Sequence, residues 1–231
     1  MNKYEMLQDD KIQVSGHILY RIKALKDFSD VRVGDLGGYI ERKENLSQKG
    51  NCWVYNNACV FGNACVYDNA CVRDNACVYD NACVFGNARV YDNACVYDNA
   101  CVYDNALVYD NAYVYGNALV YGDALVYGDA YVYGNALVYG NARVCGNGWV
   151  CGNAKISKAN DILCIAPIGS RNDVTTFFKT KDGGICVKCG CFSGTIDRFL
   201  EAVSETHKDN KHAKAYRLAC ELAKVQIELE D

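Results

Sequence analysis

The chain has 231 residues, of which 51% are hydrophobic and 23% charged, with a formal net charge of −4 at pH 7. This is enough sequence for one large domain or two small ones with a sizeable core. No segment has the basic surplus needed to bind a phosphate backbone, so we expect no direct nucleic-acid ligand. No apolar run approaches the roughly 18 residues of a membrane span, so we expect no membrane association.

The fifteen cysteines do not indicate a disulfide framework. Their number is odd, the start MNKYEMLQDD lacks the apolar centre of an export signal, and most cysteines fall inside a regular repeat. Disulfides persist mainly in oxidising compartments. The pattern therefore favours a cytoplasmic protein.

Residues 1–50 contain short strand-like pieces at Gln13–Val14 and Ile18–Ile22, followed by Gly34, Gly37 and Gly38. They precede a repeated β segment whose first edge would otherwise be open. An open edge promotes aggregation, and repeat proteins therefore need end caps. We interpret residues 1–50 as an N-terminal β cap.

Residues 51–158 consist of eighteen six-residue units without insertion or deletion, typified by NACVYD and NALVYG. The second and fourth slots, usually Ala and Val, face one side of an extended segment, and the third and fifth slots face the other. The sixth and first slots combine Asp, Gly and Asn, which tolerate positive φ and form tight corners. The pattern predicts a parallel coil with a narrow Ala/Val interior.

The repeat V-Y-D-N-A-C resembles the bacterial hexapeptide-repeat family, with Val66, Val78 and Val96 as aliphatic positions and Tyr or Phe where that family often has Gly. The resemblance implies a mainly β fold: a left-handed parallel β-helix of about six triangular coils. It also suggests a homotrimer. The flanking segments, including RIKALKDFSDVRVGDLGGYIERKENL and SRNDVTTFFKTKDGGICVKC, resemble uncharacterised phage and prophage proteins, which would place the protein in the host-cell cytoplasm.

Three units per coil place residues 18 apart in outer columns. Cysteines occupy these columns in the first three coils, and Leu, Tyr or Trp replace them in the last three. The columns could simply stabilise the coil, but large exposed apolar patches often mark contacts. We therefore predict an interaction surface, for a second copy or a host protein, formed by Tyr113, Tyr131, Trp149, Leu107, Leu125, Leu119 and Leu137.

The corner aspartates, such as Asp74, Asp92 and Asp110, form a further column. A row of carboxylates could imitate a phosphate backbone, but the rows are short and interrupted by Gly. Solvated corners are the interpretation we prefer. Likewise, collinear thiols do not provide a tetrahedral zinc site, so we interpret the cysteine columns as small apolar filler.

The repeat offers little for acyl transfer, an activity common in the resembled family. That reaction requires a general base, usually His. The three histidines, His17, His207 and His212, lie outside the repeat, the eighteen units contain no Glu, and no loop interrupts them. We expect no enzymatic activity and no cofactor, with acyl transfer as an alternative.

Residues 159–231 change character and predict a small C-terminal α+β domain. Segments 175–179 and 185–188 flank a hairpin turn at 181–184. Helices are predicted at 195–206, with Thr195 as N-cap, and at 211–229. The second helix carries an apolar stripe of Tyr216, Cys220, Ala223 and Ile227.

Cys186, Cys189 and Cys191 form a C-x-x-C-x-C cluster, a weak candidate for metal binding. A structural zinc needs four ligands, and the fourth would be Cys164 or His207. Alternation along a strand also separates Cys186 from Cys189. We therefore expect no metal.

These patterns favour a non-catalytic scaffold or interaction protein of phage type, which could inhibit a host defence system. A hexapeptide-repeat acyltransferase is one alternative. Another is a sponge that binds a small ligand such as a nucleotide between subunits, since aromatic columns could stack a base.

Overall fold

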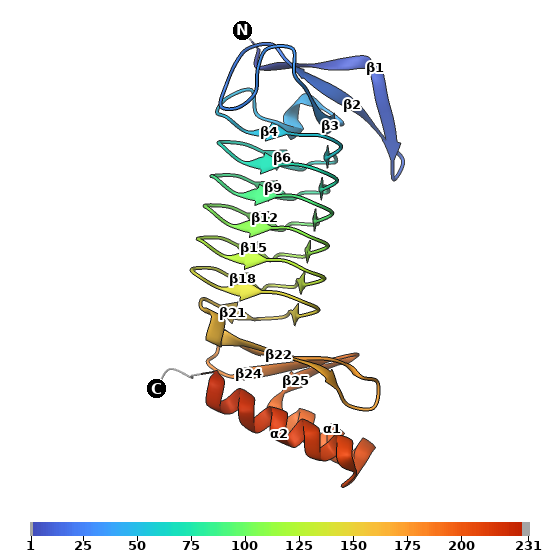
Figure 1. Cartoon of the computed structure of the whole chain (residues 1–231), viewed down its shortest axis with the longest axis vertical. Helices are drawn as coiled ribbons and strands as arrows, with labels where there is room; N and C mark the ends of the chain where they lie inside the picture. The colour runs from blue at the N-terminus through green and yellow to red at the C-terminus, as the bar shows by residue number, and fades with distance from the viewer. Residues whose placement is uncertain (1, 228–231) are drawn as a thin grey trace.

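The computed structural model describes residues 2–227 and shows a long β-helix with a different closing element at each end (Figure 1). Eighteen two-residue strands form its three faces, which run parallel to the long axis. Face 1 consists of β5 (Cys59–Val60), β8 (Cys77–Val78), β11 (Cys95–Val96), β14 (Tyr113–Val114), β17 (Tyr131–Val132) and β20 (Trp149–Val150).

The other two faces have the same length and the same parallel pairing. Face 2 consists of β4 (Trp53–Val54), β7 (Cys71–Val72), β10 (Arg89–Val90), β13 (Leu107–Val108), β16 (Leu125–Val126) and β19 (Arg143–Val144). Face 3 consists of β6 (Cys65–Val66), β9 (Cys83–Val84), β12 (Cys101–Val102), β15 (Leu119–Val120), β18 (Leu137–Val138) and β21 (Lys155–Ile156).

Residues 18 apart pair along each face, as in Cys95 with Tyr113 and Val96 with Val114. The coil therefore has three strands per turn, and the predicted outer columns are confirmed. The slot-two Ala and slot-four Val side chains of the repeat are at most 1% exposed. This uniform burial confirms the predicted Ala/Val interior and the triangular parallel β-helix.

The coil begins earlier than the repeat, so the prediction of about six turns is too low. Tyr39–Ile40 of β3 (Leu36–Ile40) pairs in parallel with β5, and Leu46 forms a parallel bridge to Val66. These residues add most of a turn before residue 51, which gives about seven turns. The sequence of this segment does not follow the six-residue repeat, so it did not predict that the segment belongs to the coil.

The N-terminal end is closed by an antiparallel hairpin of β1 (Tyr4–Val14) and β2 (His17–Ala24), followed by β3 and a short 3₁₀ helix at Lys43–Asn45. Both strands are longer than the predicted pieces. Trp53 of the first coil is 1% exposed because the rings of Tyr4 and Phe28 pack on it edge-on.

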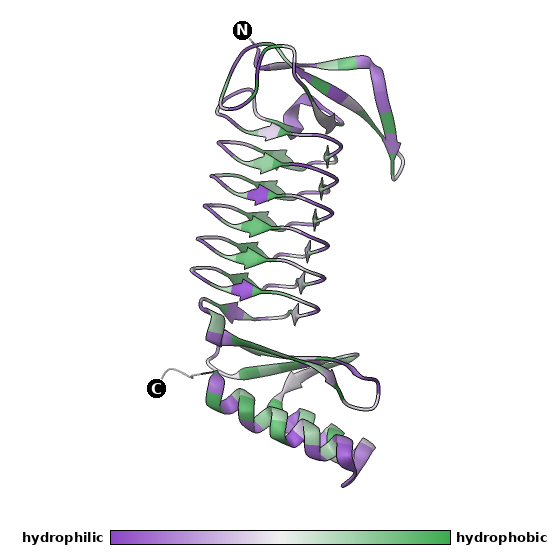
Figure 2. Ribbon diagram, in the orientation of Figure 1, coloured by the Kyte–Doolittle hydropathy of each residue, from purple (hydrophilic) through white to green (hydrophobic). Residues whose placement is uncertain are grey.

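The C-terminal end is closed by a four-stranded antiparallel sheet and two helices. After a second 3₁₀ turn (Ala159–Asp161), its elements are β22 (Ile162–Ile168), β23 (Asp173–Lys179), β24 (Ile185–Cys189), β25 (Phe192–Thr195), α1 (Ile196–His207) and α2 (Lys211–Gln226). Hydrophobic and hydrophilic residues alternate along both helices (Figure 2).

The predicted hairpin and both predicted helices are confirmed. The Thr195 side chain caps α1 by accepting a hydrogen bond from the Arg198 backbone N–H. The stripe of Tyr216, Cys220, Ala223 and Ile227 is buried. The end of the second predicted helix, at 228–229, lies outside the described residues.

The C-terminal sheet lies directly against the last coil. Phe178 belongs to the core of the β-helix, whereas its neighbour Phe177 belongs to the core between the sheet and the helices. The Trp149 backbone N–H donates to Thr176 Oγ1 at 3.1 Å, and the Lys181 backbone N–H donates to Asn153 O at 2.9 Å. The described part of the chain contains no helix long and apolar enough to span a membrane.

Candidate binding site

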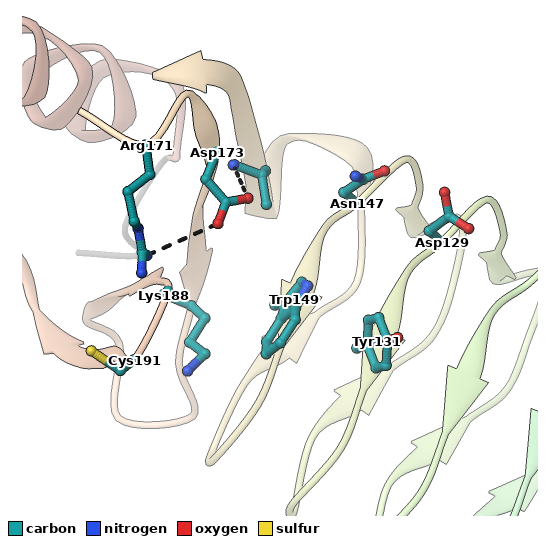
Figure 3. A pocket seen from close by; sticks show the side chains of 10 residues that line it. Asp129, Tyr131, Asn147, Trp149, Arg171, Asp173, Lys188 and Cys191 are labelled. Carbon is teal, nitrogen blue, oxygen red and sulfur yellow. Dashed lines mark hydrogen bonds and ion pairs between the residues drawn. The ribbon is translucent and has the colours of Figure 1, made fainter. Parts of the chain in front are cut away.

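The junction between face 1 and the C-terminal sheet contains a cavity of about 440 Å³, which we call the junction pocket (Figure 3). One wall comes from the last coils of the β-helix and the other from β23, β24 and the loops beside them. Its lining residues are Asp129, Tyr131, Asn147, Trp149, Arg171, Asp173, Val174, Lys188, Gly190 and Cys191.

The β-helix side of the junction pocket is an aromatic wall. The Tyr113 and Tyr131 rings stack with centroids 5.1 Å apart and planes within 5°. The Trp149 ring breaks this stack, since it tilts by 41° against Tyr131 at a centroid distance of 4.9 Å. The column ends at Trp149, so no ring from a further coil covers its outer face.

The opposite wall is cationic. Lys188 of β24 places its Nζ 5.3 Å from the centre of the Trp149 ring. Arg171 extends from the loop between β22 and β23 (Figure 3), and a Cβ at Gly190 would collide with its guanidinium. Gly190, with a φ of +56°, therefore allows Arg171 to lie across this turn.

The two carboxylates in the pocket already have partners. Asp129 Oδ1 accepts a hydrogen bond from Asn111 Nδ2 at 3.0 Å, and Asp173 Oδ1 accepts one from the Val174 backbone N–H at 2.8 Å. Arg171 approaches Asp173 only at 3.9 Å. Within residues 2–227, Lys188 has no carboxylate at ion-pair distance. The two cations and two carboxylates of the lining balance in formal charge, and Lys188 is the cation that lacks a carboxylate partner among the described residues.

A second cavity of about 270 Å³ adjoins the junction pocket and shares Arg171 and Cys191 with it. It lies between α1, α2 and the C-terminal sheet and is more apolar, with Phe192 and Phe199 in its lining. Burial, together with the nearby Cys189 thiol at 3.6 Å, raises the pKa of Tyr216 in this cavity to about 12.

The seven residues of the predicted interaction surface do not form one patch. Tyr113, Tyr131 and Trp149 lie on face 1, whereas Leu107 and Leu125 lie on face 2. Leu119 and Leu137 occupy face 3, and all seven side chains are half-buried. Tyr131 and Trp149 line the junction pocket, and contact through the remaining five stays a prediction.

The three clustered cysteines diverge in space. Cys186 packs against the core of the β-helix, whereas Cys189 packs against the core of the C-terminal domain. Cys191 lies in the turn after β24 and lines both cavities. Across residues 2–227, the His, Cys, Asp and Glu side chains form no group of three or more suited to hold a metal.

Sequence reasoning missed ladders of Asn side chains along the corners. In one column Asn63 Nδ2 donates to Asn81, Asn81 to Asn99, and Asn99 to Asn117, at 2.9–3.2 Å. The signal was the recurrence of Asn in slot one, which we interpreted only as a corner former. In the other two columns the ladder ends at Asp123 and Asp129, which accept from Asn105 and Asn111, because a carboxylate has no N–H to donate to the next residue.

The corner aspartates also bond to the next coil. Asp92 Oδ2 accepts from the Asp110 backbone N–H at 3.4 Å, and Asp98 Oδ2 accepts from the Gly116 backbone N–H at 3.1 Å. Asp92 and Asp98 are half-buried and Asp110 is exposed, so the interpretation of these corners as solvated is incomplete. They link coils as well as face water.

The architecture follows from three features: uninterrupted six-residue units, three strands per turn and an Ala/Val interior. The chain is a hexapeptide-repeat β-helix. A family model described as the YdcK β-solenoid repeat matches this β-helix at residues 112–128, 130–146 and 138–152. These matches lie in the last three coils of the repeat, close to the junction pocket.

One curated protein is similar to the chain over a short segment. It is named "Uncharacterized acetyltransferase YdcK", from Escherichia coli strain K12, and is 49% identical to the chain over 39 residues. The alignment covers 17% of this chain and 12% of that relative. The similarity is therefore confined to a short segment, and the chain spans about an eighth of the length of that relative.

Proposed function

We propose that this protein is a non-catalytic binding scaffold whose β-helix holds one wall of the junction pocket against a second wall from the C-terminal domain. The observation that carries the proposal is the convergence of Tyr131 and Trp149 with Arg171 and Lys188 around about 440 Å³. Concave sites with aromatic walls and a few polar groups are typical of small-ligand binding.

Rigidity of both walls supports this role. The aromatic wall belongs to paired strands with a fully buried interior, and the C-terminal wall belongs to a sheet that shares this core through Phe178. A pocket between two such walls loses little conformational entropy when a ligand binds.

The proposal is tested by thermal shift measurements on the full chain against a metabolite library. Compounds that raise the melting temperature of the natural protein should fail to do so for Trp149→Ala. Leu137→Ala on face 3 is the control, because it also truncates a half-buried wall residue near the end of the helix. If no compound is sensitive to Trp149, the proposal is wrong.

Acetyl transfer is a second candidate, favoured by the name of the relative that matches 39 residues of the chain. The nearest imidazole to the junction pocket is that of His207, which lines the adjoining cavity. Release of free CoA from acetyl-CoA in the presence of amine or hydroxyl acceptors, abolished in His207→Ala, would support an enzyme. Unchanged acetyl-CoA after prolonged incubation would support a scaffold.

Two expectations from sequence resemblance stay proposals. We propose a homotrimer, to be tested by the mass of the protein in solution.

We also propose that this protein is of phage or prophage origin and acts in the host cytoplasm against a host defence system. Restored phage growth in a defended host that expresses the protein would test that role.

A further inference from the structure

We infer that the ligand class of the junction pocket is a nucleoside phosphate, with the base on Trp149 and the phosphate on Lys188 and Arg171. This inference rests on the proposed function, because it names the ligand of the same pocket. It differs from binding between subunits, since both walls come from one chain.

Trp149 presents a ring face suited to stacking. The aromatic pairs in the slot-five columns stack with planes within 0–9°, as in Tyr91 with Tyr109 and Tyr121 with Tyr139. The 41° tilt of Trp149 removes it from such a stack, and its ring lies between Tyr131 and Lys188 (Figure 3). Stacking on an aromatic side chain is the common way in which proteins hold an unpaired base.

Lys188 lies over the Trp149 ring face, and a ligand could displace it. Lys188 Nζ, 5.3 Å from the ring centre, makes a cation–π contact. Such contacts at open sites are weaker than a charge-assisted hydrogen bond to an anion. A phosphate in the pocket would draw the ammonium away from the indole and leave its face to a base.

Lys188 is the group in the pocket best placed to take an anion, because no carboxylate of the described residues lies at ion-pair distance from it. Arg171 approaches Asp173 only at 3.9 Å, and Asp129 accepts a hydrogen bond from Asn111. The guanidinium of Arg171 presents several N–H donors in a plane, a geometry that matches phosphate oxygens. Lys188 adds a second cation on the same wall (Figure 3).

The rim supplies polar groups for the rest of a nucleotide. Asn147, at the corner that precedes Trp149, and Asp129, one coil earlier, both line the cavity. An amide and a carboxylate provide donors and acceptors for ribose hydroxyls or base edges. Phosphate alone would leave the aromatic wall unused, and a nucleoside alone would leave Lys188 without an anionic partner.

The test is isothermal titration of the full chain with AMP, GMP, CMP and UMP, and with adenosine, inorganic phosphate and benzoate as partial ligands. We expect at least one monophosphate to bind ten times more tightly than any partial ligand. Trp149→Ala and Lys188→Gln should each weaken that binding at least tenfold. Lys155→Gln, a half-buried lysine on face 3, is the matched control and should bind like the natural protein.

Equal affinity in Lys188→Gln and the natural protein, or no monophosphate binding below 1 mM, would overturn the inference. Tighter binding of benzoate than of every monophosphate would overturn it as well. If a library compound other than a nucleotide then binds in a Trp149-dependent manner, the binding scaffold stands and only the ligand class is wrong. If no compound does, both proposals fail. Circular dichroism confirms that each variant is folded.

Discussion

The first three coils of the repeat, residues 51–104, and the last three, residues 105–158, have the same interior and different outer surfaces. Ala and Val of both halves are at most 1% exposed. Outside, Cys columns give way to Leu, Tyr and Trp, and Asp corners give way to Gly. The comparison teaches that two inward slots per unit specify the coil, while the outward slots are free to carry function.

Asp and Gly both occupy the corner positions, where the backbone must adopt a positive φ. Corner Asp residues have φ of 57–60°, and corner Gly residues of the last three coils have φ of 58–72°. Both tolerate this left-handed conformation better than most residues. Asp adds a carboxylate that bonds to the next coil, whereas Gly lets the neighbouring backbone approach closely.

The sharpest test of the shared interior places a charge in it. Val102→Asp should lower the free energy of unfolding by about 4 kcal/mol or more, because an unpaired carboxylate would be buried. Cys101→Asp, on the half-exposed outer side of the same strand, should cost less than half as much. Urea unfolding followed by circular dichroism measures both, and equal costs would contradict the assigned interior.

The close approach of neighbouring coils at some corners predicts that two Gly→Ala substitutions lower the free energy of unfolding by different amounts. At Gly116, a Cβ would lie 2.9 Å from the Gly134 backbone nitrogen, whereas at Gly146 nothing lies within 4 Å. Both positions have positive φ, which costs an Ala roughly 1–2 kcal/mol. We expect Gly116→Ala to cost about 1 kcal/mol more than Gly146→Ala, because overpacking adds to the strain. The same urea series measures the difference.

The Asn ladders predict a smaller effect on stability, and it differs between the middle and the end of a ladder. Asn99→Asp should lower the free energy of unfolding by about 1 kcal/mol, because a carboxylate cannot donate to Asn117 Oδ1, which accepts from Asn99 at 3.2 Å. Asp123→Asn, where the ladder already ends, should cost nothing and could extend the ladder to Asn141. Thermal unfolding distinguishes the two variants, and an unchanged melting temperature in Asn99→Asp would show that the ladders contribute little.

The aromatic columns predict a weak dependence on alkaline pH. Burial and the neighbouring Tyr115 raise the pKa of Tyr97 to about 12 from 10. Between pH 10 and 12 the unfolded chain therefore loses this proton before the folded one, so stability falls as pH rises through that window and is unaffected below it. Tyrosinate absorbance should titrate above pH 10 in the folded protein and near 10 in urea. Coincident curves would contradict stacking in the columns.

The sequence alone determined the coil. Strict six-residue spacing of Ala58, Val60 and their equivalents fixes which side chains face inward, because side chains alternate along a strand. The outer columns followed once the resemblance to the hexapeptide-repeat family implied three units per turn, which places residues 18 apart side by side. The Thr195 cap and the apolar stripe of α2 were predictable for the same reason, because each depends on local spacing.

Only the tertiary structure decided the extra coil before residue 51, the bonding in the Asn ladders and the junction pocket. Leu46 forms a parallel bridge to Val66 although the sequence around Leu46 has no six-residue repeat. Trp149 and Lys188 meet because the C-terminal sheet packs on the last coil, and no periodicity in the sequence encodes that packing. Contacts between a repeat and a non-repeating domain depend on shape and burial across many residues, so they emerge only from the folded chain.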